Sequence, residues 1–400
     1  MRILVVNAGS SSLKSQLIET DGKVSLMKCL AEKVGTPDAY MNVSFAPDFQ
    51  KATYRVADMT VAECLKKLLE VLVDDPESPI SDLSQIDAIG NRIVAGGEYF
   101  TKSVIIDESA REKLELCEEL APLHNPPADA CIDMMAALMP NTPQVAVFDT
   151  AFHATMPPKA YMYPLPYELY EKHAIRKYGA HGTSHRYIAE RAAAFMDEPL
   201  EDLKLITCHL GNGSSIAAVD QGKVVDTSMG MTPLAGLMMG TRCGDLDPSV
   251  VNYLKYTLNI TGHELDEILN KKSGLLGISG VSSDKRDVEE AAAAGNKRAQ
   301  LASDMLNYQI KKIVGSYIAA MGGVDAIVFT GGIGEHDDLA RAKICHHMDW
   351  LGIRIDSEKN KDIRGDVCEI TAWGAKVRTL VIATDEELMI ARDTKEVLEK

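Results

Sequence analysis

Ile3-Leu4-Val5-Val6-Asn7-Ala8-Gly9-Ser10-Ser11-Ser12-Leu13-Lys14 is the stretch that decides the fold. Its four leading apolar residues predict a buried strand, and Gly9 lets the backbone bend and approach a ligand closely. Successive N–H groups and serine hydroxyls in such a turn can surround a phosphate, and Lys14 adds a positive charge. Taken alone, the stretch fits a serine-rich β-turn beside a solvated lysine equally well.

A second copy of the pattern lies at Leu205-Ile206-Thr207-Cys208-His209-Leu210-Gly211-Asn212-Gly213-Ser214-Ser215. Both copies run into another apolar stretch and a turn, at Asp21-Gly22-Lys23-Val24 and Gln221-Gly222-Lys223-Val224. A third junction of strand and glycine follows at Ile327-Val328-Phe329-Thr330-Gly331-Gly332-Ile333-Gly334-Glu335. Two copies about half a chain apart favour the phosphate interpretation and predict a duplicated domain.

The nucleotide motifs of two other folds do not fit. Gly9 and Lys14-Ser15 have the outer spacing of G-x-x-x-x-G-K-[ST], but Leu13 stands where the P-loop needs glycine. No G-x-G-x-x-G follows a strand, because Gly211-Asn212-Gly213 lacks the third glycine. The sequence therefore argues against a P-loop fold and against a dinucleotide-binding fold.

Length and composition narrow the class of protein further. The chain has 400 residues, which predicts two or three domains, and its formal charge of −16 argues against a nucleic-acid or anionic-membrane partner. Its eight cysteines are scattered without a C-x-x-C pair, as is typical of a reducing compartment. Neither a signal peptide nor an apolar run long enough to span a bilayer is evident. We expect a cytoplasmic protein with no membrane and no nucleic-acid partner.

Local patterns predict several elements. Thr60 to Asp75 reads as an amphipathic helix that begins with a capping box, because Glu63 follows Thr60 by three residues. Gln300 to Met321 is the longest helical pattern. Two segments are rich in glycine and are predicted to be loops, Met229 to Pro248 and Ser273 to Arg286. A loop as long as Met229 to Pro248 is more often functional than not.

Five residues stand out as candidates for chemistry. Arg92 and Arg242 lie beside glycines, and two arginines in one cleft could clamp a carboxylate and a phosphoryl group, unless they form ordinary surface ion pairs. Asp149 ends a strand, where it would orient a ligand or metal or cap the next segment. His181 lies among small residues in a loop, although a lone histidine is more often structural. Glu386 begins a helix and would hold Mg²⁺ through water or favour the helix dipole.

Taken together and in order, the motifs resemble the acetate kinase family over nearly the whole chain, from residue 3 to about 393. The remaining motifs that carry the resemblance are Phe148-Asp149-Thr150-Ala151-Phe152-His153, His181-Gly182-Thr183-Ser184-His185, Asp226-Thr227-Ser228-Met229-Gly230, Gly240-Thr241-Arg242 and Ser283-Asp284-Lys285-Arg286. The resemblance implies an α/β fold of the actin, hexokinase and Hsp70 superfamily: a duplicated actin-like (ribonuclease H-like) two-domain fold with an interdomain nucleotide cleft. The N-terminal domain would hold residues 1–150 and 385–400 with the acyl and phosphate-hairpin side. The C-terminal domain would hold residues 151–384 and serve nucleotide binding and dimerisation.

The same resemblance implies an activity. Members of the family transfer a phosphoryl group reversibly and in line between ATP and acetate, giving ADP and acetyl phosphate. They require Mg²⁺ (or Mn²⁺) and are homodimers. Such transfer needs mainly positioning and charge stabilisation. Acetate is already ionised at neutral pH, since carboxyl pKa values lie near ~4. Asp149 is therefore expected to orient groups rather than to remove a proton.

Site residues are implied by motif match only. Asn7 and Glu386 would serve the metal, while Asp149, His181 and Arg242 would be the catalytic residues. Arg92 would bind the acyl carboxylate, beside an apolar pocket for the methyl group made of Val94, Leu123 and Pro233. The nucleotide would contact Lys14, His209, Leu210, Gly211, Asn212, Gly213, Asp284, Lys285, Arg286, Gly332, Ile333, Gly334, Glu335 and His336.

Three positions depart from the family pattern. Ala95 replaces a usual histidine and is expected to loosen the support of Arg92, and His336 replaces a usual asparagine near the adenosine. Ala180 replaces a usual phenylalanine, which would widen the acyl pocket. One methylene in such a pocket is worth at most ~1–3 kcal/mol, so the expected effect is a shift of preference toward longer acids.

Three other functions compete with acetate kinase. A propionate or butyrate kinase would use the same arginines and hairpins. A pyrophosphate-dependent relative fits less well, because the nucleotide motifs are present. A non-catalytic nucleotide-binding protein of the same superfamily would not need the six candidate polar residues together, which are Asn7, Arg92, Asp149, His181, Arg242 and Glu386.

Overall fold

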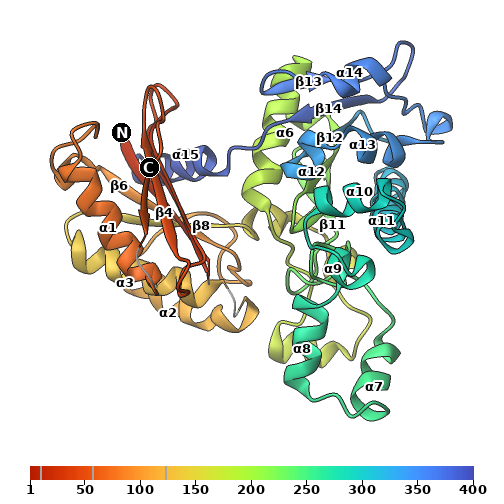
Figure 1. Ribbon diagram of the computed structural model, residues 1–400, viewed down its shortest axis with the longest axis horizontal. Helices are drawn as coiled ribbons and strands as arrows, with labels where there is room; N and C mark the ends of the chain where they lie inside the picture. Colours follow the sequence, from red (N-terminus) through yellow and green to blue (C-terminus); the bar gives the residue numbers. More distant parts are fainter. Residues whose placement is uncertain (10, 56–57, 122–123) are drawn as a thin grey trace. The chain divides into compact units, whose positions relative to one another are not determined.

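A computed structural model describes residues 1–9, 11–55, 58–121 and 124–400 (Figure 1). These residues form two units. Unit 1 holds Met1–Phe152 and Asp385–Lys400, and unit 2 holds His153–Thr384. The functional roles assigned above to the two domains stay predictions. Among the described residues, no helix is both long enough and apolar enough to cross a membrane.

Unit 1 is built on one sheet in the order β5-β4-β3-β2-β1-β6-β8-β7. Its strands are β1 (Arg2–Ala8), β2 (Ser12–Glu19), β3 (Val24–Glu32), β4 (Tyr40–Phe45), β5 (Ala52–Arg55), β6 (Ala88–Ile93), β7 (Val104–Ile105) and β8 (Gln144–Phe148). The first five form an antiparallel meander, whereas β1, β6 and β8 run parallel to one another. The predicted strand–turn–strand at the start of the chain is thus the hairpin of β1 and β2.

Helices cover both faces of this sheet. They are α1 (Val61–Asp74), α2 (Glu108–Leu116), α3 (Asn125–Leu138) and α15 (Glu386–Leu398). Successive side chains of a strand point to opposite faces, so Leu4 and Val6 pack in the cluster that includes α1 and α3, while Ile3 and Val5 pack against α15. Figure 1 shows α15 on the other side of the unit 1 sheet from α1 and α3. Burial on both faces explains why β1 is an uninterrupted apolar run.

The capping box predicted at the start of α1 is confirmed. The Thr60 hydroxyl accepts a hydrogen bond from the Glu63 N–H at 3.2 Å, and the Glu63 carboxylate accepts one from the Thr60 N–H at 2.7 Å. Such a cap stabilises a helix by roughly 0.5–2 kcal/mol. Helix α3 was not predicted, because Pro126 and Pro127 look like breakers. Both lie in its first turn, where a missing N–H costs nothing.

Unit 2 repeats the strand order of unit 1. Its sheet runs β11-β10-β9-β12-β14-β13, with strands β9 (Lys204–Leu210), β10 (Ser214–Asp220), β11 (Lys223–Thr227), β12 (Ala326–Thr330), β13 (Val367–Glu369) and β14 (Arg378–Ile382). The segment β11-β10-β9-β12-β14 matches β3-β2-β1-β6-β8, with the same antiparallel and parallel pairings. The predicted duplicated α/β fold is confirmed.

The helices of unit 2 also cover two faces. They are α4 (Pro158–Tyr161), α5 (Tyr167–His173), α6 (Gly182–Met196), α7 (Pro248–Tyr256), α8 (Gly262–Lys271), α9 (Gly274–Ser279), α10 (Lys285–Ala293), α11 (Lys297–Met321), α12 (Gly331–His336), α13 (Asp338–Cys345) and α14 (Ser357–Lys361). Alternation along β9 directs Cys208 into the core beneath α11 and Thr207 toward His185 of α6. This places polar residues of β9 and α6 in contact.

The predictions for the glycine-rich segments were confirmed in one case and wrong in another. Residues 229–247 contain no helix or strand, as predicted, and helix α11 ends at Gly322 as expected from Gly322-Gly323. The prediction of a loop from Ser273 to Arg286 is wrong, since α9 and the start of α10 lie there. Gly274 and Gly280 have positive φ values of 62° and 68° at the two ends of α9, so these glycines bound a short helix.

Gly90 in β6 provides a test of how α15 is seated. A Cβ there would lie 2.5 Å from Thr394 Oγ1 and 2.8 Å from Ile390 Cγ2 on α15. Gly90→Ala should therefore lower the free energy of unfolding by about 1–3 kcal/mol, measured by urea titration. Gly315→Ala is the matched control, because nothing lies within 4 Å of its added methyl group in the middle of α11. It should stabilise the protein by about 0.5–1 kcal/mol. Equal stability of the two variants would contradict this account.

Candidate active site

Three polar side chains of unit 1 meet at the carboxyl edge of its parallel strands. Asn7 lies near the end of β1, Arg92 near the end of β6, and Asp149 directly after β8. The register pairs Val6 with Asn91, and Arg92 with Val147, so these strands end together. Polar residues that are far apart in the sequence are thereby collected at one place.

Arg92 is the centre of this group. Its Nε and Nη2 atoms donate to the two carboxylate oxygens of buried Asp149 at 3.2 and 2.6 Å, and its Nη1 donates to Asn7 Oδ1 at 3.2 Å. Glu386 Oε2 lies 3.9 Å from Nε. Burial lowers the pKa of the Arg92 guanidinium, but the charges of Asp149 and Glu386 outweigh it and raise that pKa above its ordinary value. The planar guanidinium is thus held in one orientation.

Lys14 is held by a second carboxylate of α15. Its Nζ lies 2.8 Å from Oε1 of buried Glu387, and the register of the first hairpin pairs Lys14 with Asn7. Burial lowers the pKa of Lys14, and Glu387 more than restores it, so the net pKa is raised. The start of α15 therefore brings one carboxylate to each of the two cations, Arg92 and Lys14.

The donor atoms in unit 1 fit a hard cation such as Mg²⁺. Asn7 Oδ1 and Glu386 Oε2 both lie within 4 Å of the Arg92 guanidinium, at Nη1 and Nε respectively. Mg²⁺ commonly takes one or two protein ligands and completes its shell with water and substrate phosphates. Three carboxylates, those of Asp149, Glu386 and Glu387, face two cations, which leaves a net negative charge for a metal to neutralise. No group of three His, Cys, Asp or Glu side chains that could hold a metal occurs within the described part of the chain.

The three residues predicted to form the apolar pocket do not all belong to one unit. Val94 is half-buried just after β6, Pro233 is half-buried in the 229–247 loop of unit 2, and Leu123 lies outside the described residues. The pocket itself stays a prediction. The backbone of Ala95 donates to Asn125 Oδ1 at 3.1 Å and accepts from Asn125 Nδ2 at 2.8 Å. The segment beside Arg92 is therefore anchored through its backbone, which needs no side chain at position 95.

In unit 2, two of the predicted catalytic side chains lie at the turn of the second hairpin. A Cβ added to Gly213 would stand 3.5 Å from His181 Nε2 and 3.6 Å from Arg242 Nη1. The described hydrogen bonds of Arg242 Nη1 go to Pro233 O at 3.1 Å and to Met239 Sδ at 3.5 Å, both uncharged. Burial lowers the pKa of Arg242. A partly buried guanidinium with neutral partners is suited to an anionic ligand.

His181 has a backbone conformation that is uncommon for a residue other than glycine. It precedes α6 with φ 58° and ψ 24°, in the left-handed region. Such conformations of non-glycine residues are held by their surroundings and concentrate at functional sites. Its Nδ1 lies 2.8 Å from Ser215 Oγ, and its ring stacks on that of His209 with centroids 4.3 Å apart. His209 Nδ1 in turn lies 2.7 Å from Ser184 Oγ.

The turn of the second hairpin is closed by its own atoms. Gly211 N–H donates to Gly213 O at 3.1 Å, and Ser214 Oγ donates to Gly211 O at 2.9 Å. Gly240 is required beside it, because a Cβ there would lie 1.7 Å from Asn212 Oδ1. The 229–247 loop therefore touches the turn directly, through the Gly240 N–H that donates to Asn212 O at 3.0 Å.

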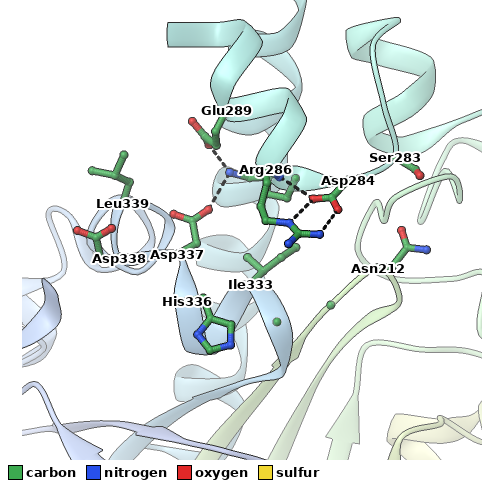
Figure 2. A pocket seen from close by; sticks show the side chains of 13 residues that line it. Asn212, Ser283, Asp284, Arg286, Glu289, Ile333, His336, Asp337, Asp338 and Leu339 are labelled. Atoms are coloured by element: carbon green, nitrogen blue, oxygen red, sulfur yellow. Dashed lines mark hydrogen bonds and ion pairs between the residues drawn. The ribbon is translucent and has the colours of Figure 1, made fainter. Parts of the chain in front are cut away.

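A pocket of about 660 Å³ opens beside this turn (Figure 2). It is lined by Gly211, Asn212, Ser283, Asp284, Lys285, Arg286, Glu289, Gly332, Ile333, His336, Asp337, Asp338 and Leu339. Eight of these residues were assigned to the nucleotide by motif match. Figure 2 shows Arg286 paired with Asp284, and both His336 and Ile333 carried by α12.

Other residues predicted to bind the nucleotide do not line this pocket and contact protein atoms. Lys14 lies in unit 1, His209 stacks on His181, and the backbone of Leu210 packs against Gly331. Glu335 Oε1 accepts from Gly331 N–H at 2.9 Å and thus closes the first turn of its own helix. Gly334 O accepts from Nη1 of Arg341 at 2.8 Å.

Arg341 is fully buried and was missed by the sequence analysis. Besides Gly334, it donates to Asn360 Oδ1 at 2.8 Å and to Asn360 O at 2.7 Å, so all its described acceptors are uncharged oxygens. It fastens the end of α12 to α13 and α14. An arginine in a helical segment without a nearby motif gives no sequence signal for such a role.

Lys285 is also buried, with Nζ 3.0 Å from Asp337 Oδ2 and in contact with Glu289. It therefore links α10 to the start of α13, the two walls of the pocket. Glu289 accepts a further hydrogen bond from Ser303. Although burial acts to raise the pKa of Glu289, the hydrogen bonds from Lys285 and Ser303 prevail and lower it.

Ala180 does not leave the empty space that its small size suggests. It is buried and packs in a cluster with Met229 and Met239. Methionine fills irregular gaps readily because its chain is flexible. These methionines occupy room beside position 180, which weighs against the predicted widening of the acyl pocket.

Glu387 and His185 were also not assigned a role. Glu387 lies on the buried stripe of α15 with Ile390, Ala391 and Thr394, at spacings of three, four and seven. A carboxylate at an apolar position of a helix is the signal that could have revealed it. His185 lies four residues after His181, among the buried residues of the first turn of α6.

Lys285→Met tests the ion pair that joins the pocket walls. Removing the ammonium leaves two carboxylates facing one another, so the free energy of unfolding at pH 7 should fall by about 1–3 kcal/mol. The lowered pKa of Glu289 contributes stability to the wild type above pH 4.5, and this contribution is lost as the pH falls through the folded-state pKa. In the variant, Glu289 keeps the hydrogen bond from Ser303 but loses Lys285 and faces Asp337, so less of this contribution is present, and the difference between the two proteins should shrink as the pH drops from 7 to below 4.5. Urea titrations at several pH values measure it.

The control for this experiment is Lys361→Met, which removes an exposed ion pair: Lys361 Nζ lies 3.4 Å from Glu358 Oε1. Its effect should stay below about 0.5 kcal/mol at every pH. A Lys285→Met effect that does not depend on pH would contradict the role assigned to Lys285.

The model of the acetokinase family matches residues 2–392. An acetate kinase of Clostridium kluyveri is 52% identical over 401 residues, covering all of this chain and 98% of that protein, and one of Clostridium botulinum is 53% identical over the full length of both. The crystal structure of Porphyromonas gingivalis acetate kinase has a TM-score of 0.93 at 45% identity, covering 99% of each chain. A propionate kinase from Francisella tularensis has a TM-score of 0.92 at 43% identity with the same coverage. The chain therefore belongs to the acetokinase family.

Proposed function

We propose that this protein is an acetate kinase, which transfers the terminal phosphoryl group of ATP reversibly and in line to acetate, giving ADP and acetyl phosphate. The observation that carries the proposal is the meeting of His181 Nε2 and Arg242 Nη1 at Gly213, on the turn of the second phosphate hairpin. Two hydrogen-bond donors held at a phosphate-binding turn can stabilise the charge that develops on the phosphoryl group in the transition state.

The roles in unit 1 follow from the contacts of Arg92. Its guanidinium binds the carboxylate of acetate, and Asp149 holds that guanidinium through two parallel hydrogen bonds. Because Asp149 is committed to Arg92 and acetate is already ionised, Asp149 acts as an orienting group and no strong base is required. Val94, Leu123 and Pro233 are proposed to surround the methyl group.

Mg²⁺, which Mn²⁺ can replace, is proposed to be held through Asn7 and Glu386. When bound, it supplies charge neutralisation on the phosphate oxygens. Glu387 sets the position of Lys14, which contacts the nucleotide phosphates. Arg92, through its contacts with both Asn7 and Glu386, keeps the two metal ligands near each other.

The 660 Å³ pocket is proposed to take the nucleoside of ATP. Its size falls within the range of small-molecule sites, and its walls combine the apolar Ile333 with polar groups such as Asp284 and His336. Arg286 is largely exposed and available to the ligand, whereas Lys285 is engaged by carboxylates and supports the walls. His336 is the proposed determinant of base preference.

The working form is proposed to be a cytoplasmic homodimer. All eight cysteines are free, six of them buried, as suits a reducing compartment. On α7, Val250, Tyr253 and Tyr256 recur every three residues and are all exposed, which gives unit 2 an apolar stripe for a second copy of the chain. The acidic surface supports neither a nucleic-acid nor a membrane partner.

Arg242→Ala tests the transition-state role. Removing one preorganised donor should lower kcat by about 10²–10³-fold, with a smaller change in KM for either substrate. Trapping acetyl phosphate as the hydroxamate gives the rate. The control is Arg364→Ala, an arginine that is 82% exposed and pairs with Asp362, and its rate should equal that of the wild type. Unchanged kcat in Arg242→Ala would remove the basis of the proposal.

Acyl preference separates acetate kinase from the competing propionate or butyrate kinase, a choice kept open by the similarity to a propionate kinase. Because Met229 and Met239 fill the space beside Ala180, kcat/KM should decrease from acetate to propionate to butyrate. Each added methylene should cost at most ~1–3 kcal/mol in the barrier. The same hydroxamate assay over the three acids measures it, and a clear preference for a longer acid would overturn the acetate assignment.

A further inference from the structure

A continuous hydrogen-bonded chain runs from the interior of unit 2 to His181. Thr207 Oγ1 lies 2.8 Å from His185 Nδ1, His185 Nε2 lies 2.7 Å from Ser215 Oγ, and Ser215 Oγ lies 2.8 Å from His181 Nδ1. Thr207, His185 and Ser215 are all fully buried. The chain therefore ends at one ring nitrogen of His181, while the other, Nε2, faces Gly213 and Arg242.

The number of protons on these atoms restricts how the chain can be arranged. Thr207 Oγ1 donates to Ala217 O at 3.4 Å, so it is free to accept from a proton on His185 Nδ1. A neutral His185 with its proton on Nδ1 has a lone pair on Nε2, which accepts the single hydroxyl proton of Ser215. Ser215 Oγ must then accept from His181 Nδ1. This direction gives Thr207, His185 and Ser215 each a partner of the right kind and keeps the bond from Thr207 to the carbonyl of Ala217, which the reverse direction would break.

The surroundings keep His185 in the neutral form that this arrangement needs. Burial first, and then the neighbouring rings of His153 and His209, hold the pKa of His185 well below its ordinary value. The centroids of these two rings lie 5.6 and 6.3 Å from that of His185. The neighbours of His181 within unit 2 include two titratable or charged side chains, His209, stacked at 4.3 Å, and Arg242.

We infer that His185 and Ser215 are positioning residues that fix a proton on Nδ1 of His181 and so dedicate its Nε2 to the transferring phosphoryl group. Which nitrogen of a histidine carries the proton is set by the hydrogen bond that the other makes. A His181 that donates from Nδ1 can take a second proton on Nε2 and become a cation that donates to the phosphoryl oxygens. In the cation both ring nitrogens carry a proton, so Nδ1 can no longer accept a hydrogen bond. If Ser215 donated to Nδ1 instead, forming the cation would therefore break the hydrogen bond between Ser215 and His181.

The inference rests on the proposed function, since it assigns His181 to phosphoryl transfer. It adds that the left-handed backbone of His181 and the hydrogen-bonded chain of Thr207, His185 and Ser215 together position the His181 ring. The backbone at φ 58° sets where the ring lies, and Ser215 sets how the ring is turned and protonated. Neither His185 nor Ser215 needs to touch the substrate.

The test compares three variants. Ser215→Ala removes the partner of His181 Nδ1, and His185→Phe removes the acceptor that orients Ser215. In both, kcat should fall roughly 10–100-fold near pH 7.5 with KM for ATP and acetate changed less than about threefold. Losing a partner that favours the charged ring lowers the pKa of His181, so the alkaline limb of the kcat profile should move to lower pH. His185→Gln, whose amide oxygen can still accept from Ser215, should restore kcat to within about threefold of the wild type.

A second measurement does not depend on activity. In protein labelled with ¹⁵N-histidine, and with His181 assigned by comparison with His181→Asn, the wild type should show a protonated Nδ1 at high pH, and Ser215→Ala should show a shift of that proton to Nε2. If His185→Phe fails to fold, as judged by its urea transition, Ser215→Ala decides the matter alone. An unchanged kcat profile and an unchanged His181 tautomer in Ser215→Ala would overturn the inference. A wild type that makes no acetyl phosphate would instead refute the proposed function, leaving the tautomer result to stand for itself.

Discussion

The in-register ending of parallel strands is the constraint on which both halves of this protein depend. In unit 1, β1, β6 and β8 end together, so Asn7, Arg92 and Asp149 meet although up to 142 residues separate them in the chain. In unit 2, β9, β12 and β14 run in the same order. Each unit thus collects polar residues at the carboxyl edge of its sheet, where open α/β sheets bind ligands. The two buried faces pack against different clusters, so a slip of one residue would move Leu4 and Val6 out of the cluster with α1 and α3 and into the one with α15.

The cations of the candidate site are held in two different ways. Arg92 has carboxylate partners, and their charges outweigh the effect of burial on its pKa. Arg242 has only neutral described partners, and burial lowers its pKa. A buried charge without a counter-ion is costly, and an anion that arrives there regains part of that cost. Arg242 is therefore a cation whose charge its described partners leave uncompensated, so a bound anion would be stabilised there although the net charge of the protein is −16.

Much of this organisation can be predicted from the sequence, because it depends on short-range rules. Repeated strand and glycine patterns give the duplicated fold, and Thr60 with Glu63 gives the start of α1. The loop predicted from Ser273 to Arg286 failed because glycines that bound a helix look like glycines of a loop. The contacts of Glu387 with Lys14, of Ser215 with His181 and of Lys285 with Asp337 arise only through tertiary packing. Sequence spacing carries no information on those distances, whereas a parallel sheet makes the meeting of strand ends almost obligatory.

The two hairpins show how a duplicated scaffold has diverged in chemistry. Asn7 pairs with Lys14 in the first, and His209 pairs with Ser215 at the corresponding register of the second. The neighbouring parallel strand supplies Arg92 in unit 1 and Thr330 in unit 2. One copy therefore carries fixed charges and a proposed metal ligand, and the other carries hydroxyls and imidazoles that pass hydrogen bonds to His181. Phosphoryl transfer needs both, because charge must be neutralised while donors keep a fixed direction.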